Sequence, residues 1–360
     1  MSVKYLLISN MWPSEDAPGY GSFVKNVVDG LSTSSFECKY CAVIVGRPKS
    51  FFDKLCKYIL FYIHIVKYYF AEYDFVYIHF PNQALPVLIP LFYIKKKKIV
   101  INLHGEDLIY KEGGLSGILG KMNDWFMKKA IAIVVPSDYY KNVTIQRINC
   151  DPNMLVVSPS GGINPSYFYN AKYNKQHDTN IIHIGYVGRI DPNKGWRQFI
   201  DVVRLLPEGF NFKATIIGTG SEIDDLKKAI SSLKPRTVSH ILHVQQHELR
   251  KYYTQFDLFI FPTMRKEESL GLVGIEAMAC GVPVIGSDIG GIPSYLTDGY
   301  NGFLVPPGDV FTIANRIVTF SMLSHIEKER MVNNCLERSQ LYYAPNVISN
   351  LAERLNTILN

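Results

Sequence analysis

Two acidic residues, Glu268 and Glu276, lie eight positions apart in the stretch EESLGLVGIEAMACG at residues 267–281. The pattern predicts one helix, apolar nearly all round, that begins near Leu270 and ends at Gly281. Glu276 falls about two turns into this helix, where a carboxylate is costly unless it is hydrogen-bonded or paired. Its partner could be a Lys or Arg elsewhere in the chain, or a vicinal diol such as a ribose that donates two hydrogen bonds.

The start of the same predicted helix is a candidate anion site. With Ser269 as N-cap, the backbone N–H groups of Leu270, Gly271 and Leu272 would be free, shortly after a predicted strand. A helix N-terminus in such a place is a natural phosphate site. Glu268 stands just before the helix, where acidic residues are also common because of the helix dipole, so on its own it does not define a site.

A second group of charges lies in GYVGRIDPNKG, residues 185–195. Arg189 and Lys194 follow the first predicted strand of the second half, where a loop would open onto a ligand cleft. A guanidinium and an ammonium together suit a diphosphate leaving group. The alternative is that both are solvated surface cations.

Two positions in the first half also follow predicted strands. Gly21, in APGYGSF, precedes a predicted helix and would let the backbone approach a ligand. The third glycine of a dinucleotide fingerprint is Val24 here, and Ile223 in the later IIGTGSEI, which argues against a nicotinamide or flavin enzyme. His104, in NLHGEDL, ends a buried strand, a better position for function than most single histidines occupy.

The elements that must hold these residues read as a repeated alternation of apolar strands and helices. This pattern predicts an α/β protein with parallel strands covered on both faces. The strands are expected at 3–9, 40–45, 75–80, 98–104 and 132–137, then at 181–189, 212–218, 240–244, 258–263, 282–288 and 302–307. The domains are predicted as 1–168 and 169–344, with a last helix at about 345–360 that is a candidate for packing back on the first domain.

Composition narrows the class of protein. With 360 residues, of which 47% are hydrophobic and 19% charged, the chain predicts a folded protein of two domains. A net charge of +6 is too weak to argue for nucleic acid, but it is compatible with an anionic membrane surface. Cys38 and Cys41 are predicted to be reduced, buried core residues, because no second pair completes a zinc site. The N-terminus predicts a first buried strand rather than a signal peptide.

Taken in order, APGYGSF, HGED, GRIDPNKG and the run that begins EESLGLVGIEAMACGVPVIGSDIGG resemble family four of the retaining glycosyltransferases. The resemblance spans nearly the whole chain and is strongest from Gly185 to Asp309, with Glu268 and Glu276 as the E(x7)E signature. It implies the GT-B fold, in which two Rossmann-like domains face a central cleft. The family often has Phe where Leu270 stands and a doubled glycine where this chain has GYG; these departures blur donor and acceptor specificity.

The resemblance implies a role for each of the four charged candidates in the second half. Glu276 would hold the ribose hydroxyls of the nucleotide, and Glu268 would contact hydroxyls of the donor sugar. Arg189 and Lys194 would bind the diphosphate. Without nucleotide, Glu276 should be satisfied by water or a neighbouring polar group rather than by a closed salt bridge.

The remaining implied roles complete a donor site. Backbone N–H groups of Leu270 to Leu272 would assist at the diphosphate, His104 would lie beside the transferred sugar, and Gly21 would let the first loop approach the phosphates. The catalytic residues would then be His104, Arg189, Lys194 and Glu268. The expected enzyme is a retaining hexosyltransferase that forms an α-linkage. It would need no metal or other cofactor, and no side-chain base, because the leaving phosphate takes the acceptor's proton.

The donor is expected to be a UDP-sugar, with a GDP-sugar possible, and the acceptor a lipid-linked saccharide in O-antigen, capsule or exopolysaccharide synthesis. Residues 51–70 and the lysines Lys95–Lys98 form a basic, apolar region suited to a membrane interface, or else a core helix and a solvated turn. The expected location is the cytoplasm, at the inner face of the membrane. A sugar-nucleotide epimerase and a catalytically silent nucleotide-sugar-binding partner are the alternatives.

Overall fold

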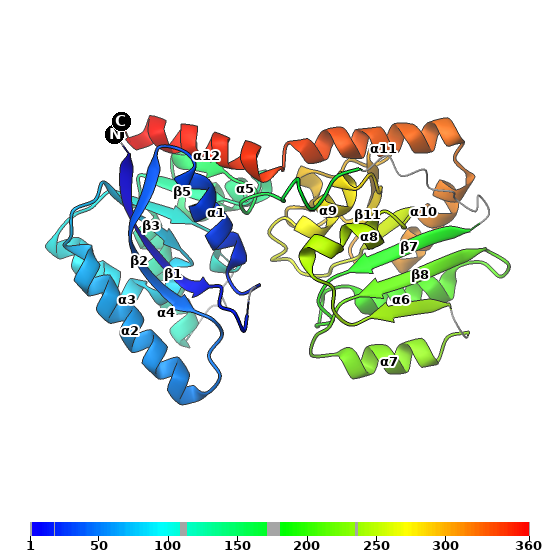
Figure 1. The fold of residues 1–360 in the computed structure, drawn as a ribbon, viewed down its shortest axis with the longest axis horizontal. Helices are drawn as coiled ribbons and strands as arrows, with labels where there is room; N and C mark the ends of the chain where they lie inside the picture. Colours follow the sequence, from blue (N-terminus) through cyan, green and yellow to red (C-terminus); the bar gives the residue numbers. More distant parts are fainter. Residues whose placement is uncertain (1, 18, 109–113, 171–180, 235–236, 360) are drawn as a thin grey trace. The chain divides into compact units, whose positions relative to one another are not determined.

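The computed structural model describes residues 2–17, 19–108, 114–170, 181–234 and 237–359, and the chain divides into two compact units (Figure 1). The first unit contains Met1–Gly162 together with Ala344–Asn360, and the second contains Ile163–Tyr343. Each unit holds one six-stranded parallel sheet, so the predicted α/β class with parallel strands is confirmed.

The sheet of the first unit has the strand order β2-β1-β3-β4-β5-β6. Its strands are β1 (Val3–Trp12), β2 (Phe36–Val45), β3 (Phe75–His79), β4 (Ile99–Asn102), β5 (Ala132–Val135) and β6 (Leu155–Val157). The sequence predicted no strand at β6, which has only three residues. Its helices are α1 (Ser22–Ser32), α2 (Phe51–Tyr69), α3 (Leu85–Ile94), α4 (Gly114–Met127), α5 (Asp138–Ile148) and α12 (Ala344–Leu359).

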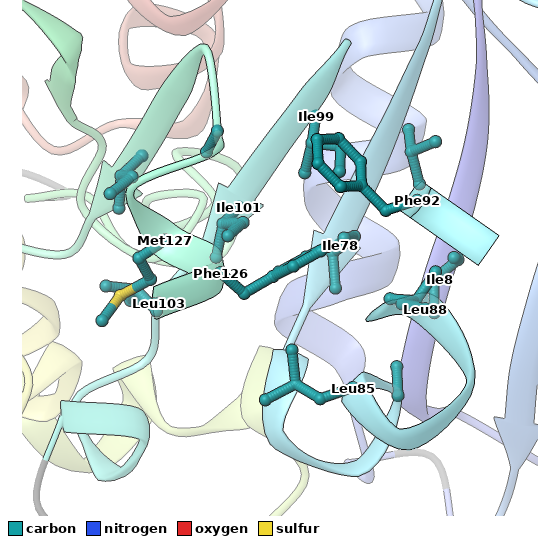
Figure 2. Packing of buried hydrophobic residues seen from close by; sticks show 14 of the residues in the cluster. Ile8, Ile78, Leu85, Leu88, Phe92, Ile99, Ile101, Leu103, Phe126 and Met127 are labelled. Atoms are coloured by element: carbon teal, nitrogen blue, oxygen red, sulfur yellow. The ribbon is translucent and has the colours of Figure 1, made fainter. Parts of the chain in front are cut away.

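Two hydrophobic layers sandwich this sheet. Helices α2 to α5 cover one face, where the side chains of Ile78 and Ile101 from the strands meet Leu88 and Phe126 from the helices (Figure 2). Helices α1 and α12 cover the other face. Because each strand buries both of its faces, it reads as a continuous apolar run rather than an alternating one. Because β1, β3 and β4 run parallel, their carboxyl ends lie at the same edge of the sheet.

The sheet of the second unit has the order β12-β11-β10-β7-β8-β9. Its strands are β7 (Ile182–Val187), β8 (Phe212–Ile217), β9 (Val238–Ile241), β10 (Leu258–Phe261), β11 (Val284–Ser287) and β12 (Gly302–Val305). Its helices are α6 (Trp196–Leu205), α7 (Ile223–Ser231), α8 (Arg250–Tyr253), α9 (Leu272–Ala279), α10 (Val310–Met322) and α11 (His325–Gln340). Helices α6, α7 and α10 pack on one face, and α8 and α9 on the other.

One expectation about local structure is corrected. Cys41 is exposed and Cys38 only half-buried, so the prediction of two core cysteines is wrong. The reason is that β2 is the edge strand, with a register irregularity between the pairs Tyr5–Cys38 and Leu6–Tyr40.

In the part of the chain that the structure describes, no helix is both long and apolar enough to cross a bilayer, and no cluster of three or more acidic, His or Cys side chains is placed to hold a metal.

Candidate functional site

The loop between β10 and α9 carries the first of the two glutamates. Helix α9 begins at Leu272, so the predicted start near Leu270 with Ser269 as N-cap is wrong. The N-cap is Gly271, in the left-handed conformation with φ 74°, and a Cβ there would lie 2.3 Å from a ring carbon of Phe261. Only glycine fits this close approach, and it delays the helix by two residues.

This later start changes which backbone groups face outward from the helix. Leu272 and Val273 are the first-turn residues, and their N–H groups have no acceptor among the described residues. Leu270 lies before the cap, and its side chain is buried in the hydrophobic cluster of this unit. The N–H groups of Leu272 and Val273 are therefore available at the helix N-terminus, and Leu272 is one of the three donors that the sequence predicted.

Glu268 is held by a cation and a hydroxyl. The Lys194 ammonium lies 2.9 Å from Oε2 of Glu268, and the Thr263 hydroxyl donates to the same oxygen at 3.2 Å. Glu268 is only 8% exposed, and Thr263 is fully buried. The structure thus brings together Lys194 and Glu268, which are 74 positions apart, and adds Thr263, to which the sequence reading gave no role.

The loop after β7 holds Arg189 and Lys194 at its two ends. The hydroxyl of buried Tyr186 lies 3.1 Å from the backbone carbonyl oxygens of both residues, which fixes the width of the loop. Gly195 closes it with φ 92°, where a Cβ would lie 2.3 Å from the carbonyl oxygen of Pro262. The side chains differ: Lys194 is directed to Glu268, whereas Arg189 is 58% exposed and pairs with Asp191 at 2.9 Å.

Glu276 lies on α9 and is satisfied by neutral donors. The Gln246 amide donates to Oε1 and the Tyr253 hydroxyl to Oε2, each at 3.1 Å. No cation of the described residues lies within ion-pair distance, so the salt-bridge alternative is wrong and the expected polar neighbours are confirmed. Burial raises the pKa of Glu276 to about 7, because two neutral hydrogen bonds only partly offset the lost hydration.

His104 follows β4 and lies against a second histidine. Its Nε2 is 3.0 Å from Nδ1 of His79, the last residue of β3. Burial lowers the pKa of His104 to about 3, and that of the fully buried His79 also falls well below its usual value. The sequence reading missed His79, although FVYIH ends in histidine at the same strand end as NLH.

Gly21 lies at the start of α1, the helix whose first turn contacts His104. It is the N-cap of α1, with φ 74°, and a Cβ there would lie 2.7 Å from the backbone of Met11. Two residues further on, the Phe23 ring lies 4.7 Å from the His104 ring, centroid to centroid. The structure therefore gathers the start of α1 and His104 at the carboxyl ends of β1 and β4.

Comparison with known proteins relates this chain to one family. Residues 168–338 match the family described as glycosyl transferases group 1. Over 250 residues the chain is 30% identical to the capsular polysaccharide biosynthesis glycosyltransferase CapM of Staphylococcus aureus, an alignment covering 66% of this chain and 64% of that protein. The chain is therefore similar to the group 1 glycosyltransferases, most directly over residues 168–338.

A further relative and a solved structure agree with that similarity. The putative colanic acid biosynthesis glycosyltransferase WcaL of Salmonella typhimurium is 25% identical over 272 residues, covering 74% of this chain and 66% of that one. The chain thus spans just under two thirds of the length of CapM and WcaL. HepE from Anabaena, solved in complex with UDP, superposes with a TM-score of 0.75 at 20% identity, covering 99% of this chain and 100% of that one, which confirms the GT-B-like fold.

Proposed function

We propose that this protein is a group 1 glycosyltransferase that moves a sugar from a nucleotide diphosphate donor to a hydroxyl of a saccharide, with retention of configuration. The observation that carries the proposal is the cluster of Lys194, Glu268 and Thr263 beside the N-terminus of α9, with Glu276 further along the same helix. A cation, free N–H groups and two carboxylates are the groups that a diphosphate, a sugar and a ribose require.

The chemistry of the proposed transfer is electrostatic. As the bond to the anomeric carbon breaks, negative charge grows on the diphosphate, and preorganised donors stabilise it best. Lys194 and the N–H groups of Leu272 and Val273 supply such donors, and Arg189 joins them by exchanging Asp191 for phosphate. Glu268 orients sugar hydroxyls, and the leaving phosphate accepts the proton of the incoming hydroxyl. The charge is met without a metal ion.

A UDP-sugar is the donor that we propose. HepE, which shares the fold, has been solved in complexes with UDP and with UDP-glucose. The relatives CapM and WcaL are described by their roles in capsular polysaccharide and colanic acid biosynthesis. We therefore propose polysaccharide biosynthesis as the setting, with a lipid-linked saccharide as acceptor at the cytoplasmic face of the membrane.

Helix α2 supports that location because it has apolar residues on two opposite sides. One side, with Phe61, Ile65 and Tyr69, is buried in the core of the first unit. The other side is exposed and repeats at intervals of three and four residues: Phe52, Leu55, Ile59, Ile63, Val66 and Phe70. Because both sides of α2 are apolar, its sequence does not show the single apolar stripe of an amphipathic helix. One side of the helix belongs to the core, and the other leaves an apolar face exposed.

The charges around this exposed face favour an anionic surface. Lys54 and Lys67 are exposed on α2, whose one acidic residue is Asp53. The Tyr69 hydroxyl donates to the Lys95 carbonyl at 2.9 Å, so the basic run that starts there lies beside the end of α2. Apolar side chains flanked by lysines are suited to the interface of a bilayer that contains acidic lipids.

Sedimentation with liposomes tests the membrane contact. The protein should pellet with vesicles containing phosphatidylglycerol at low salt and much less with pure phosphatidylcholine. The triple substitution Leu55→Ser, Ile59→Ser and Ile63→Ser should abolish pelleting, whereas Ile326→Ser, at an even more exposed site in the second unit, should not. Equal pelleting of the triple variant and the wild type would overturn this contact. If light scattering shows a dimer for the wild type and a monomer for the triple variant, the face binds a second copy of the chain instead.

Product analysis tests the reaction itself. The protein should release UDP from a UDP-sugar only when a polyprenyl-diphosphate-linked saccharide is present, and the new linkage should be α by proton coupling constants. The Glu268→Gln variant should release little. An isomerised nucleotide sugar formed without acceptor would establish an epimerase, and donor binding with no product from any tested pair would establish a silent binding partner; either result overturns the proposal.

A further inference from the structure

His79 and His104 form a pair at the carboxyl ends of two neighbouring strands. In the register of β3 with β4, His79 lies opposite Asn102, and His104 follows two residues later. The distance of 3.0 Å between Nδ1 of His79 and Nε2 of His104 is that of a hydrogen bond, so one of these nitrogens carries the shared proton. The two rings are close to parallel, with an interplanar angle of 22°.

Neutral imidazoles leave this pair two arrangements. Each ring then has one N–H and one lone pair, so the proton on the shared bond fixes the state of both outer nitrogens. If His104 donates, its Nδ1 is an acceptor and His79 has an N–H at Nε2. If His79 donates, His104 has an N–H at Nδ1 and Nε2 of His79 has a lone pair.

The surroundings of His79 distinguish the two arrangements. Its Nε2 is buried and has no hydrogen-bond partner in the described part of the chain, and the Tyr77 ring packs beside it at 4.7 Å between centroids. A buried N–H without an acceptor is rarer in proteins than an acceptor without a full set of donors. The arrangement that leaves a lone pair on this atom is therefore favoured over one that leaves an N–H there.

We infer that His79 is a positioning residue that donates from Nδ1 to Nε2 of His104 and so keeps the proton of His104 on Nδ1. His104 then offers an N–H, the group that a sugar hydroxyl oxygen accepts, and has no free lone pair with which to act as a base. Phe80 stacks on the His104 ring at 4.4 Å between centroids and holds its plane. This role rests on the proposed transfer reaction, but the tautomer itself does not.

Nitrogen-15 NMR of the whole protein labelled at histidine reads the tautomer directly. In the wild type, long-range proton–nitrogen correlations should show His104 protonated at Nδ1, with the resonance assigned by its loss in His104→Gln. In His79→Phe, which removes both nitrogens and keeps a planar ring, His104 should move to the Nε2-protonated form that a free histidine side chain prefers. An Nε2-protonated His104 in the wild type, or an Nδ1 proton that persists in His79→Phe, would overturn the inference.

The conservative variant His79→Asn provides the second measurement. Its side-chain amide can donate from near the position of Nδ1, so it should restore the Nδ1-protonated His104 and most of the turnover that His79→Phe loses. We expect kcat to fall about tenfold in His79→Phe, with little change in donor KM. If the tautomers behave as stated but no transfer occurs in the wild type, the proposed function fails and the positioning role of His79 stands. If His79→Phe does not fold, the wild-type and His79→Asn spectra still decide the question.

Discussion

Glu268 and Glu276 are both nearly buried carboxylates of the same segment, but the structure satisfies them in opposite ways. Glu268 has a cation, Lys194, at 2.9 Å, together with the Thr263 hydroxyl. Glu276 has only neutral donors. A paired carboxylate has its charge compensated before any ligand binds, whereas one held by dipoles remains close to the point where it takes up a proton.

The difference also indicates which partners a ligand could replace. Gln246, which donates to Glu276, comes from the exposed turn η4 (Gln246–Glu248), while Tyr253 is fully buried. A ribose diol could therefore take the place of Gln246 without disturbing the core. At Glu268, an arriving diphosphate would instead compete for Lys194, so that binding of the donor and release of the carboxylate toward the sugar are one event.

The largest effect is expected from removing the cation that pairs with Glu268. Lys194→Ala should lower kcat/KM at least about 30-fold, equivalent to about 2 kcal/mol of transition-state stabilisation, because it removes a charged donor from the diphosphate and leaves Glu268 unpaired. Steady-state kinetics with the preferred UDP-sugar measures this. Lys227→Ala, at an exposed pair with Asp224, is the matched control and should be unaffected. Turnover like that of the wild type would remove Lys194 from the mechanism.

Removing the second carboxylate should act on binding instead. Glu276→Ala should weaken the affinity for free UDP about 20-fold by calorimetry, because hydrogen bonds from the ribose to a charged acceptor are lost. At saturating donor, kcat should change little. Gln246→Ala removes the replaceable partner and should alter affinity by less than about threefold. If both variants bind UDP like the wild type, the ribose is held elsewhere.

The sequence was sufficient for the strands other than the short β6 and for picking out the two glutamates, because both depend on local pattern. Continuous apolar runs identify strands buried on both faces, and an acidic residue inside an apolar helix is conspicuous wherever the helix packs. The start of α9 was not predictable, since it depends on Gly271 meeting the ring of Phe261. Helix propensity and capping rules contain no information on that contact.

The partners of the site residues were also beyond the sequence. Tyr253 and Gln246 approach Glu276 from other elements, and only the packed fold brings them within hydrogen-bond distance. Thr263 lies in the same loop as Glu268, and the conformation of that loop brings its hydroxyl to the carboxylate. His79 is the intermediate case. Its place at the end of β3 could be read from the sequence, but its pairing with His104 follows from the β3–β4 register.

The smallest effect should come from pH, and it separates the two glutamates most sharply. Ribose hydroxyls donate to a carboxylate but gain little from a protonated carboxyl, so nucleotide binding favours the ionised form of Glu276. With its pKa raised to about 7 by burial, Glu276 is mostly protonated at pH 6 and mostly ionised at pH 8, and UDP affinity should rise about tenfold across that interval. Calorimetry at matched ionic strength measures the rise.

The terminal phosphate of UDP also titrates in this range, and Glu276→Gln, which keeps that titration and removes the carboxyl, gives the baseline to subtract. The same rise in Glu276→Gln would show that the nucleotide, and not Glu276, is the titrating group. In Glu268→Gln the rise should persist, because Glu276 is still present.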